Sequence, residues 1–142
     1  MKNYITPSII MFLLFCLINV SCKKVVKDTK SNYEIKLGTG NCLDYKSDTI
    51  VIFFESHFDN DLVQVSVNKK EVFKGTVTTD KTLGYAKDVN LGSIKNISKV
   101  KININKGKDV LLDKLTCNYI FVNYIKDSIV SVKFDNKFVP YQ

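Results

Sequence analysis

The stretch Lys-Val-Lys-Ile-Asn-Ile-Asn at residues 99–105 decides the fold. Apolar and polar side chains alternate along it with a period of two, the pattern of a β-strand with one buried and one solvated face. The residues expected to face the core are Val100, Ile102 and Ile104, and those expected to face solvent are Lys99, Lys101 and Asn103. Residues 105–108 read Asn-Lys-Gly-Lys, which is typical of a hairpin turn because glycine adopts positive φ without strain.

The same period continues in both directions from this stretch. Strand character recurs at residues 33–37, 49–56, 63–67, 72–79, 83–91, 118–125, 128–134 and 137–139, whereas residues 109–115 are ambiguous. Turn-forming residues separate these segments, and none has the 3.6-residue period of an amphipathic helix. About eight or nine short strands predict a single all-β domain over residues 33–142. We expect an antiparallel β-sandwich, with a small β-barrel as the alternative.

The composition fits one globular domain with an unusual choice of basic residue. The chain has 142 residues, of which 45% are hydrophobic and 25% are charged, and this length leaves no room for two ordinary cores. All 21 basic residues are lysine, against 14 acidic residues, so the formal net charge is +7. Specific nucleic-acid recognition favours arginine, whose planar fork binds two oxygens at once, so its absence argues against a nucleic-acid partner. The lysine excess leaves an anionic partner open, although compositional drift of a genome explains it equally well.

The first 22 residues have the organisation of a bacterial export signal. Lys2 supplies a positive start, and residues 9–18 form an apolar run shorter than the roughly 20 residues that span a bilayer. Ser21-Cys22 then resembles the lipobox of bacterial lipoproteins, in which a cysteine after a small residue is acylated and becomes the new N-terminus. The resemblance implies that residues 1–21 are removed and that Cys22 carries the lipid. It also implies a membrane-anchored protein in the periplasm or at the cell surface, with the outer membrane expected.

Two other outcomes stay open for this segment, because Asn19 stands where that family prefers an apolar residue. Ordinary signal cleavage nearby releases a soluble protein, and an uncleaved segment acts as an anchor itself. Residues 22–32 contain four lysines and no periodic pattern, so we interpret them as the lipidated cysteine followed by a flexible tether. Two or three acyl chains matter here because a single chain attaches a protein only marginally.

Cys42 and Cys117 are the two cysteines left after the signal and the lipid site are set aside. An exported domain with two remaining thiols favours a disulfide, since extracytoplasmic compartments are oxidising. Closing a loop of this length stabilises a protein by about 4 kcal/mol in the chain-entropy model. The alternative is two separate buried thiols that act as small hydrophobic residues. The absence of a Cys-x-x-Cys pattern favours a structural role.

The sequence offers no convincing catalytic or metal site. Ser56 precedes the single histidine, His57, but adjacent residues of a strand point to opposite faces, so we expect a turn histidine rather than a nucleophile and its base. Residues 59–61 read Asp-Asn-Asp and place oxygens close together, yet these residue types also form turns without a cation. We therefore expect no enzyme activity, no metal and no cofactor.

Two groups of side chains are candidates for binding. The aromatic residues that a sugar ring could stack on are Tyr45, Phe58, Tyr119, Tyr124 and Tyr141. The lysines on the expected solvent faces of their strands are Lys74, Lys99, Lys101 and Lys133. If those strands share a sheet, the lysines form a face for an anionic glycan or an acidic protein; otherwise they are an ordinary solvated surface. The expected function is a non-enzymatic binding or structural lipoprotein, and the alternatives are a carbohydrate-binding module or, less favoured, a small hydrolase or inhibitor.

Overall fold

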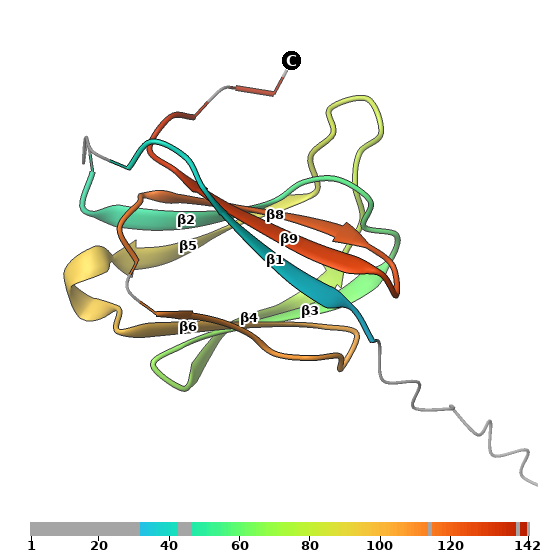
Figure 1. Cartoon of the computed structure of the whole chain (residues 1–142), viewed down its shortest axis with the longest axis horizontal. Coiled ribbons are helices and arrows are strands. Elements are labelled where there is room, and N and C mark those ends of the chain that lie inside the picture. The colour runs from blue at the N-terminus through green and yellow to red at the C-terminus, as the bar shows by residue number, and fades with distance from the viewer. Residues whose placement is uncertain (1–31, 43–46, 114, 139, 142) are drawn as a thin grey trace, which may run out of the picture.

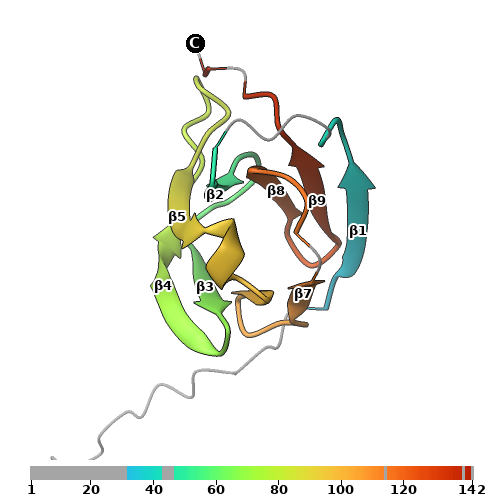
Figure 2. The same ribbon diagram turned by 90° about the vertical axis from the view of Figure 1, so that its left-hand side faces the viewer.

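The computed structural model describes residues 32–42, 47–113, 115–138 and 140–141. Its strands are β1 (Glu34–Thr39), β2 (Thr49–Phe54), β3 (Asp61–Val67), β4 (Lys70–Val77), β5 (Lys87–Ser93), β6 (Lys99–Ile104), β7 (Val110–Asp113), β8 (Tyr119–Ile125) and β9 (Ile129–Asp135). They form two facing sheets (Figures 1 and 2), which confirms the predicted β-sandwich. The sheets do not close into a barrel, so the barrel alternative is wrong.

The five-stranded sheet has the order β1-β9-β8-β2-β5, and the four-stranded sheet has the order β4-β3-β6-β7. Most neighbours are antiparallel, but β1 runs parallel to β9 and β2 runs parallel to β8. These two pairs depart from the expected antiparallel arrangement because their strands are far apart in sequence, and no tight hairpin fixes their relative direction.

The stretch that predicted the fold forms β6, in the middle of the four-stranded sheet between β3 and β7. Val100, Ile102 and Ile104 are completely buried. Lys99 and Lys101 are exposed and Asn103 is half-buried on the opposite face. The predicted facing of this strand is confirmed. Alternate residues of β2, β3, β8 and β9 meet β6 in one core.

Two expected strand positions are wrong. The strand expected over residues 83–91 is β5 and begins only at Lys87, because a turn comes first. Asp80 organises that turn: its Oδ1 oxygen accepts the backbone N–H groups of Thr82 at 2.8 Å and Leu83 at 3.3 Å. The strand expected over residues 137–139 is absent at Lys137 and Phe138, and Val139 lies outside the described residues.

The residues expected to form the export signal and the tether lie outside the described residues as far as residue 31, as does Tyr45. Within the described ranges, a single helical turn, Ile94–Asn96, is present, and it is far too short to cross a membrane. Tyr33 opens the described domain with a buried ring, and its hydroxyl donates to the carbonyl oxygen of Lys108 at 2.5 Å. This bond joins the start of the five-stranded sheet to the β6–β7 turn of the other sheet.

Candidate binding surfaces

The predicted disulfide joins Cys42 to Cys117, whose Cα atoms lie 5.0 Å apart. It ties the segment after β1 to the start of β8, at the end of the sheet where β2 also begins. Asn118 stabilises the same corner, because its buried Nδ2 group donates to the carbonyl oxygens of Ser47 and, at 3.0 Å, Thr49. The prediction of a bridge is confirmed, and the bridge closes one corner of the five-stranded sheet.

His57 lies in the bend after β2, as predicted, with an exposed side chain and a φ of 72°. The backbone N–H of Ser56 donates to the Oδ1 oxygen of Asn123 at 3.0 Å. Among the described residues, no hydrogen bond joins the side chains of Ser56 and His57. This bend therefore serves to redirect the chain from β2 toward the other sheet.

The Asp59–Asp61 loop uses its oxygens within the protein. Asp61 is buried, its Oδ2 oxygen accepts the N–H of Asp59 at 2.7 Å, and its Oδ1 oxygen accepts the Nδ2 group of Asn105 at 2.6 Å. These bonds tie the start of β3 to the end of β6. No group of three His, Cys, Asp or Glu side chains suited to a metal ion is present among the described residues.

Three of the four candidate lysines lie on the outer face of the four-stranded sheet. Lys74 is on β4, and Lys99 and Lys101 are on β6. Lys133 is on β9, in the other sheet, where its Nζ lies 3.0 Å from the Asp135 carboxylate. The four lysines therefore do not share one face, because strands that look alike in sequence belong to opposite layers.

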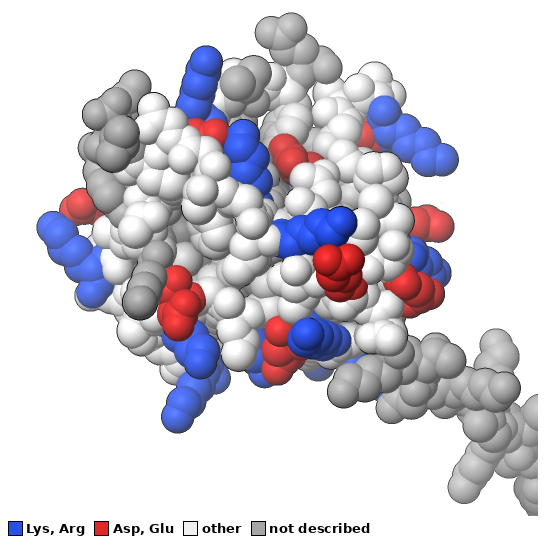
Figure 3. All heavy atoms as spheres, in the orientation of Figure 1, with Lys and Arg blue, Asp and Glu red and all other residues white. Residues whose placement is uncertain are grey.

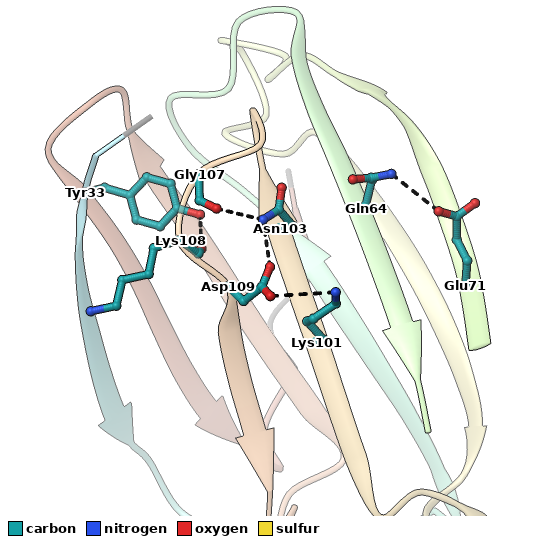
Figure 4. Close-up of polar contacts among 8 residues, drawn as sticks. All are labelled: Tyr33, Gln64, Glu71, Lys101, Asn103, Gly107, Lys108 and Asp109. Carbon is teal, nitrogen blue, oxygen red and sulfur yellow. Dashed lines mark hydrogen bonds and ion pairs between the residues drawn. The ribbon is translucent and has the colours of Figure 1, made fainter. Parts of the chain in front are cut away.

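The outer face of the four-stranded sheet, here called the lysine surface, is a mixed polar surface (Figure 4). Lys101 lies 3.7 Å from the Asp109 carboxylate, which also accepts the Nδ2 group of Asn103 at 2.8 Å. Two shallow hollows adjoin these groups. The one lined by Ser66, Lys69, Lys99, Lys101 and Leu111 is the more basic of the two.

The net charge of the described residues is small. The described residues include 14 lysines and 12 acidic residues, for a net charge of +2, so most of the excess of the whole chain lies elsewhere. Lysines and acids are interspersed on the side of the molecule that Figure 3 presents, which also carries β1. A surface with this alternation exerts little long-range attraction on a polyanion.

A second surface covers the outer face of the five-stranded sheet. Six aromatic residues meet there, and we call this group the aromatic face: Phe53, Tyr85, Tyr119, Phe121, Phe138 and Tyr141. At its centre the rings of Phe53 and Phe121, neighbours on β2 and β8, stack with centroids 5.4 Å apart and planes 17° apart. Tyr119 extends the group along β8, 5.8 Å from Phe53. The opposite phase of both strands points into the core, so this cluster is separate from it.

Carboxylates and an amide border the aromatic face. Glu55 accepts the Tyr141 hydroxyl at 2.9 Å and the Asn123 Nδ2 group at 2.8 Å. Asp88 accepts the Tyr85 hydroxyl at 2.5 Å. Burial, helped by the Asp88 hydrogen bond, raises the pKa of Tyr85 to about 12, and burial followed by the Glu55 hydrogen bond raises the pKa of Tyr141. Both phenols are therefore protonated donors at neutral pH.

The aromatic residues expected from the sequence to bind a sugar lie only partly on this surface. Tyr119 and Tyr141 belong to the aromatic face, whereas Phe58 and Tyr124 are buried in the core. The aromatic residues of this surface that the sequence did not predict are Phe53, Tyr85, Phe121 and Phe138. The signal for two of them is in the strands, because Tyr119 and Phe121 share a phase on β8, and Phe53 has the phase opposite to the buried Phe54. No protein-family model matches this chain, and no match was found among curated proteins or solved structures.

Proposed function

We propose that this chain is a membrane-anchored lipoprotein that acts outside the cytoplasm as a non-enzymatic binding module, and that the aromatic face is its ligand-binding surface. The proposed ligand class is a neutral saccharide. The location rests on the Ser21-Cys22 pattern after the apolar run and on the lysine-rich tether that follows it. The observation that carries the binding role is the cluster of touching aromatic rings outside the core.

Aromatic rings on a sheet provide a flat apolar surface against which the C–H face of a pyranose ring packs. The bordering groups suit the hydroxyls of such a ring, since Glu55 and Asp88 are acceptors and Asn123 both donates and accepts. Two carboxylates at this border favour an uncharged sugar over an acidic one, because like charges at short range repel.

The location is tested by labelling the chain with a palmitate analogue in a bacterial host. The wild type should carry the label, and Cys22→Ser should lose it. Equal labelling of the two proteins would exclude lipidation at Cys22, and release of the wild type as an unlabelled soluble protein would identify ordinary signal cleavage.

The binding role is tested by calorimetric titration of the domain with cellohexaose and chitohexaose. Phe121→Ser should weaken binding by about tenfold or more, because it removes a ring from the centre of the surface. Ile125→Ser is the matched control: it lies in the same phase of β8, is 47% exposed, and has no part in the aromatic face. Absence of binding to either sugar by the wild type, or an equal loss in both variants, would contradict the proposal.

A second candidate ligand is an anionic group on the lysine surface. The observation that favours it is the basic hollow, where Lys69 and Lys99 make no ion pair with any described residue. Binding to a heparin-like polysaccharide at low salt should then fall when Lys69 and Lys99 are replaced by Gln. Such binding should also disappear near 1 M salt, where screening shortens to about 3 Å. Unchanged low-salt binding in the double variant would contradict this second candidate and would mean that these lysines are only a solvated surface.

A further inference from the structure

The chain continues past β9 onto the aromatic face. Asn136 donates its backbone N–H to the carbonyl oxygen of Asn41 at 3.0 Å, beside the disulfide. The segment beyond it, here called the strap and described at Lys137, Phe138, Pro140 and Tyr141, runs along the outer side of the five-stranded sheet (Figures 1 and 2). Two of the six aromatic residues of the surface thus come from the C-terminal end of the chain rather than from the sheet.

Side chains hold the strap in place. The Phe138 ring stacks on Phe53 with centroids 5.0 Å apart and planes 24° apart, and it lies 5.8 Å from Tyr119. The Tyr141 ring lies 4.8 Å from the Tyr85 ring, and its hydroxyl donates to Glu55 at 2.9 Å. Among the described residues, no backbone-to-backbone hydrogen bond joins the strap to the sheet. The described residues of the strap can therefore leave the sheet without breaking a strand ladder.

The side chains of the strap also resemble the proposed saccharide ligand in the groups that they place against the sheet. Phe138 lays a ring nearly flat on Phe53, and Tyr141 offers a hydroxyl to the Glu55 carboxylate. A pyranose combines the same two features, an apolar face and hydroxyl donors. Phe138 is also 37% exposed, so its own outer surface is not covered by the rest of the domain.

We infer that the strap is a displaceable cover and that the ligand-binding part of the aromatic face is the part carried by the sheet. Phe138 and Tyr141 occupy the place, over Phe53 and beside Glu55, that a saccharide ring takes when it binds. This inference rests on the proposed function and adds its regulation. The apparent affinity of the protein equals the affinity of the open form multiplied by the fraction of molecules in which the strap is open. Any partner or cleavage that removes the strap raises the affinity without a change in the sheet.

The test compares an open variant of the full chain, Phe138→Ser with Tyr141→Ser, with the wild type and with Ile125→Ser. The probes are cellohexaose and chitohexaose, titrated under the same conditions. If the strap is open in about one molecule in ten, the open variant should bind about tenfold more tightly than the wild type. Ile125→Ser should match the wild type, and Phe121→Ser added to the open variant should remove the gain.

A gain in affinity cannot arise from misfolding, so this result is interpretable even if the open variant is less stable. Tyr141→Phe provides a milder step, since it removes only the hydroxyl that Glu55 accepts, and it should give a smaller gain. The strap would be contradicted as a cover if the wild type, Tyr141→Phe and the open variant bound equally well. If Phe121→Ser still lost binding in that case, the proposed binding role of the aromatic face would be retained. No binding by any variant would overturn the saccharide assignment and the strap with it.

Discussion

Gly40 and Asp135 approach each other so closely that a Cβ atom on Gly40 would clash with the Asp135 Oδ2 oxygen. The carbonyl of Phe134, which accepts the Gly40 N–H at 2.6 Å, would lie 2.9 Å from the same Cβ. The end of β1 therefore meets the end of β9 at a residue that must lack a side chain. This contact lies between the disulfide and the start of the strap.

Gly40→Ala should destabilise the domain by about 1–3 kcal/mol, the usual cost of forcing an extra group into a packed contact. Gly38→Ala is the matched control, because it lies two residues earlier on β1 and its Cβ would meet only the Val132 carbonyl, at 4.0 Å. We expect Gly38→Ala to change the free energy of unfolding by less than about 0.5 kcal/mol. Denaturant titrations of the two variants measure the difference. Equal stability would show that the Asp135 side chain moves aside freely.

Asp135 should make the stability depend on acid pH. The backbone N–H of Lys137, followed by the Lys133 ammonium, lowers the pKa of Asp135 from its ordinary value of 3.8. An acid whose pKa is lower in the folded state stabilises the fold above the unfolded-state pKa, and this contribution is lost as the pH falls through the folded-state value. The wild type should therefore lose stability below about pH 4 more steeply than Asp135→Asn. Parallel acid profiles of the two proteins would contradict this prediction.

Ile102 tests the facing of β6. It is completely buried and pairs in register with Val65 and Val110, so Ile102→Ala should cost about 2–5 kcal/mol. Lys99→Ala, an exposed change on the same strand, should cost less than about 0.5 kcal/mol. Both values come from chemical denaturation. A loss below about half a kilocalorie in Ile102→Ala would mean that the sheets repack around it.

Tyr85 should report on the aromatic face at alkaline pH. Its pKa of about 12 lies above the ordinary value of 10.0, because burial and the Asp88 hydrogen bond both oppose ionisation. The stabilisation is complete below pH 10.0 and is lost as the pH rises toward 12. Asp88→Asn should lower the pKa of Tyr85, as followed by the ultraviolet absorbance of tyrosinate. Comparison with Tyr85→Phe identifies which part of the tyrosinate absorbance comes from Tyr85. If the titration curve of Asp88→Asn were identical to that of the wild type, the Asp88 carboxylate would not contribute to the raised pKa of Tyr85.

The sequence was sufficient to predict those features of the structure that depend on a local pattern of residues. The alternation at residues 99–105 predicted the facing of β6, and the two remaining cysteines predicted the bridge. The sheet order was not predictable in this way. Lys133 and Lys101 occupy similar positions in similar strands, but long-range pairing places them in opposite layers. The same limit applies to Tyr124 and Tyr119, because an aromatic residue in a strand joins the core or the surface according to its phase, and the phase of β8 is ambiguous when both faces are apolar.

The position of the strap could not be predicted from the local sequence, for a different physical reason. The residues from Lys137 onward alternate like a strand, yet β9, which they follow, is already paired on both sides by β1 and β8. They pack through Phe138 and Tyr141 on a surface assembled from β2 and β8, about which the C-terminal residues carry no information themselves.

The position of the disulfide has a mechanical consequence. The chain enters the sandwich at Tyr33 and β1, an edge strand that is paired on one side only, with β9. A force applied to the N-terminal end therefore acts on β1 first. Once β1 is stripped from the edge, the load reaches Cys42 and passes through a covalent bond to Cys117 in the middle of the domain. Unravelling from this end should therefore stop at Cys42 while the bond is intact, and reducing the bond should remove that stop.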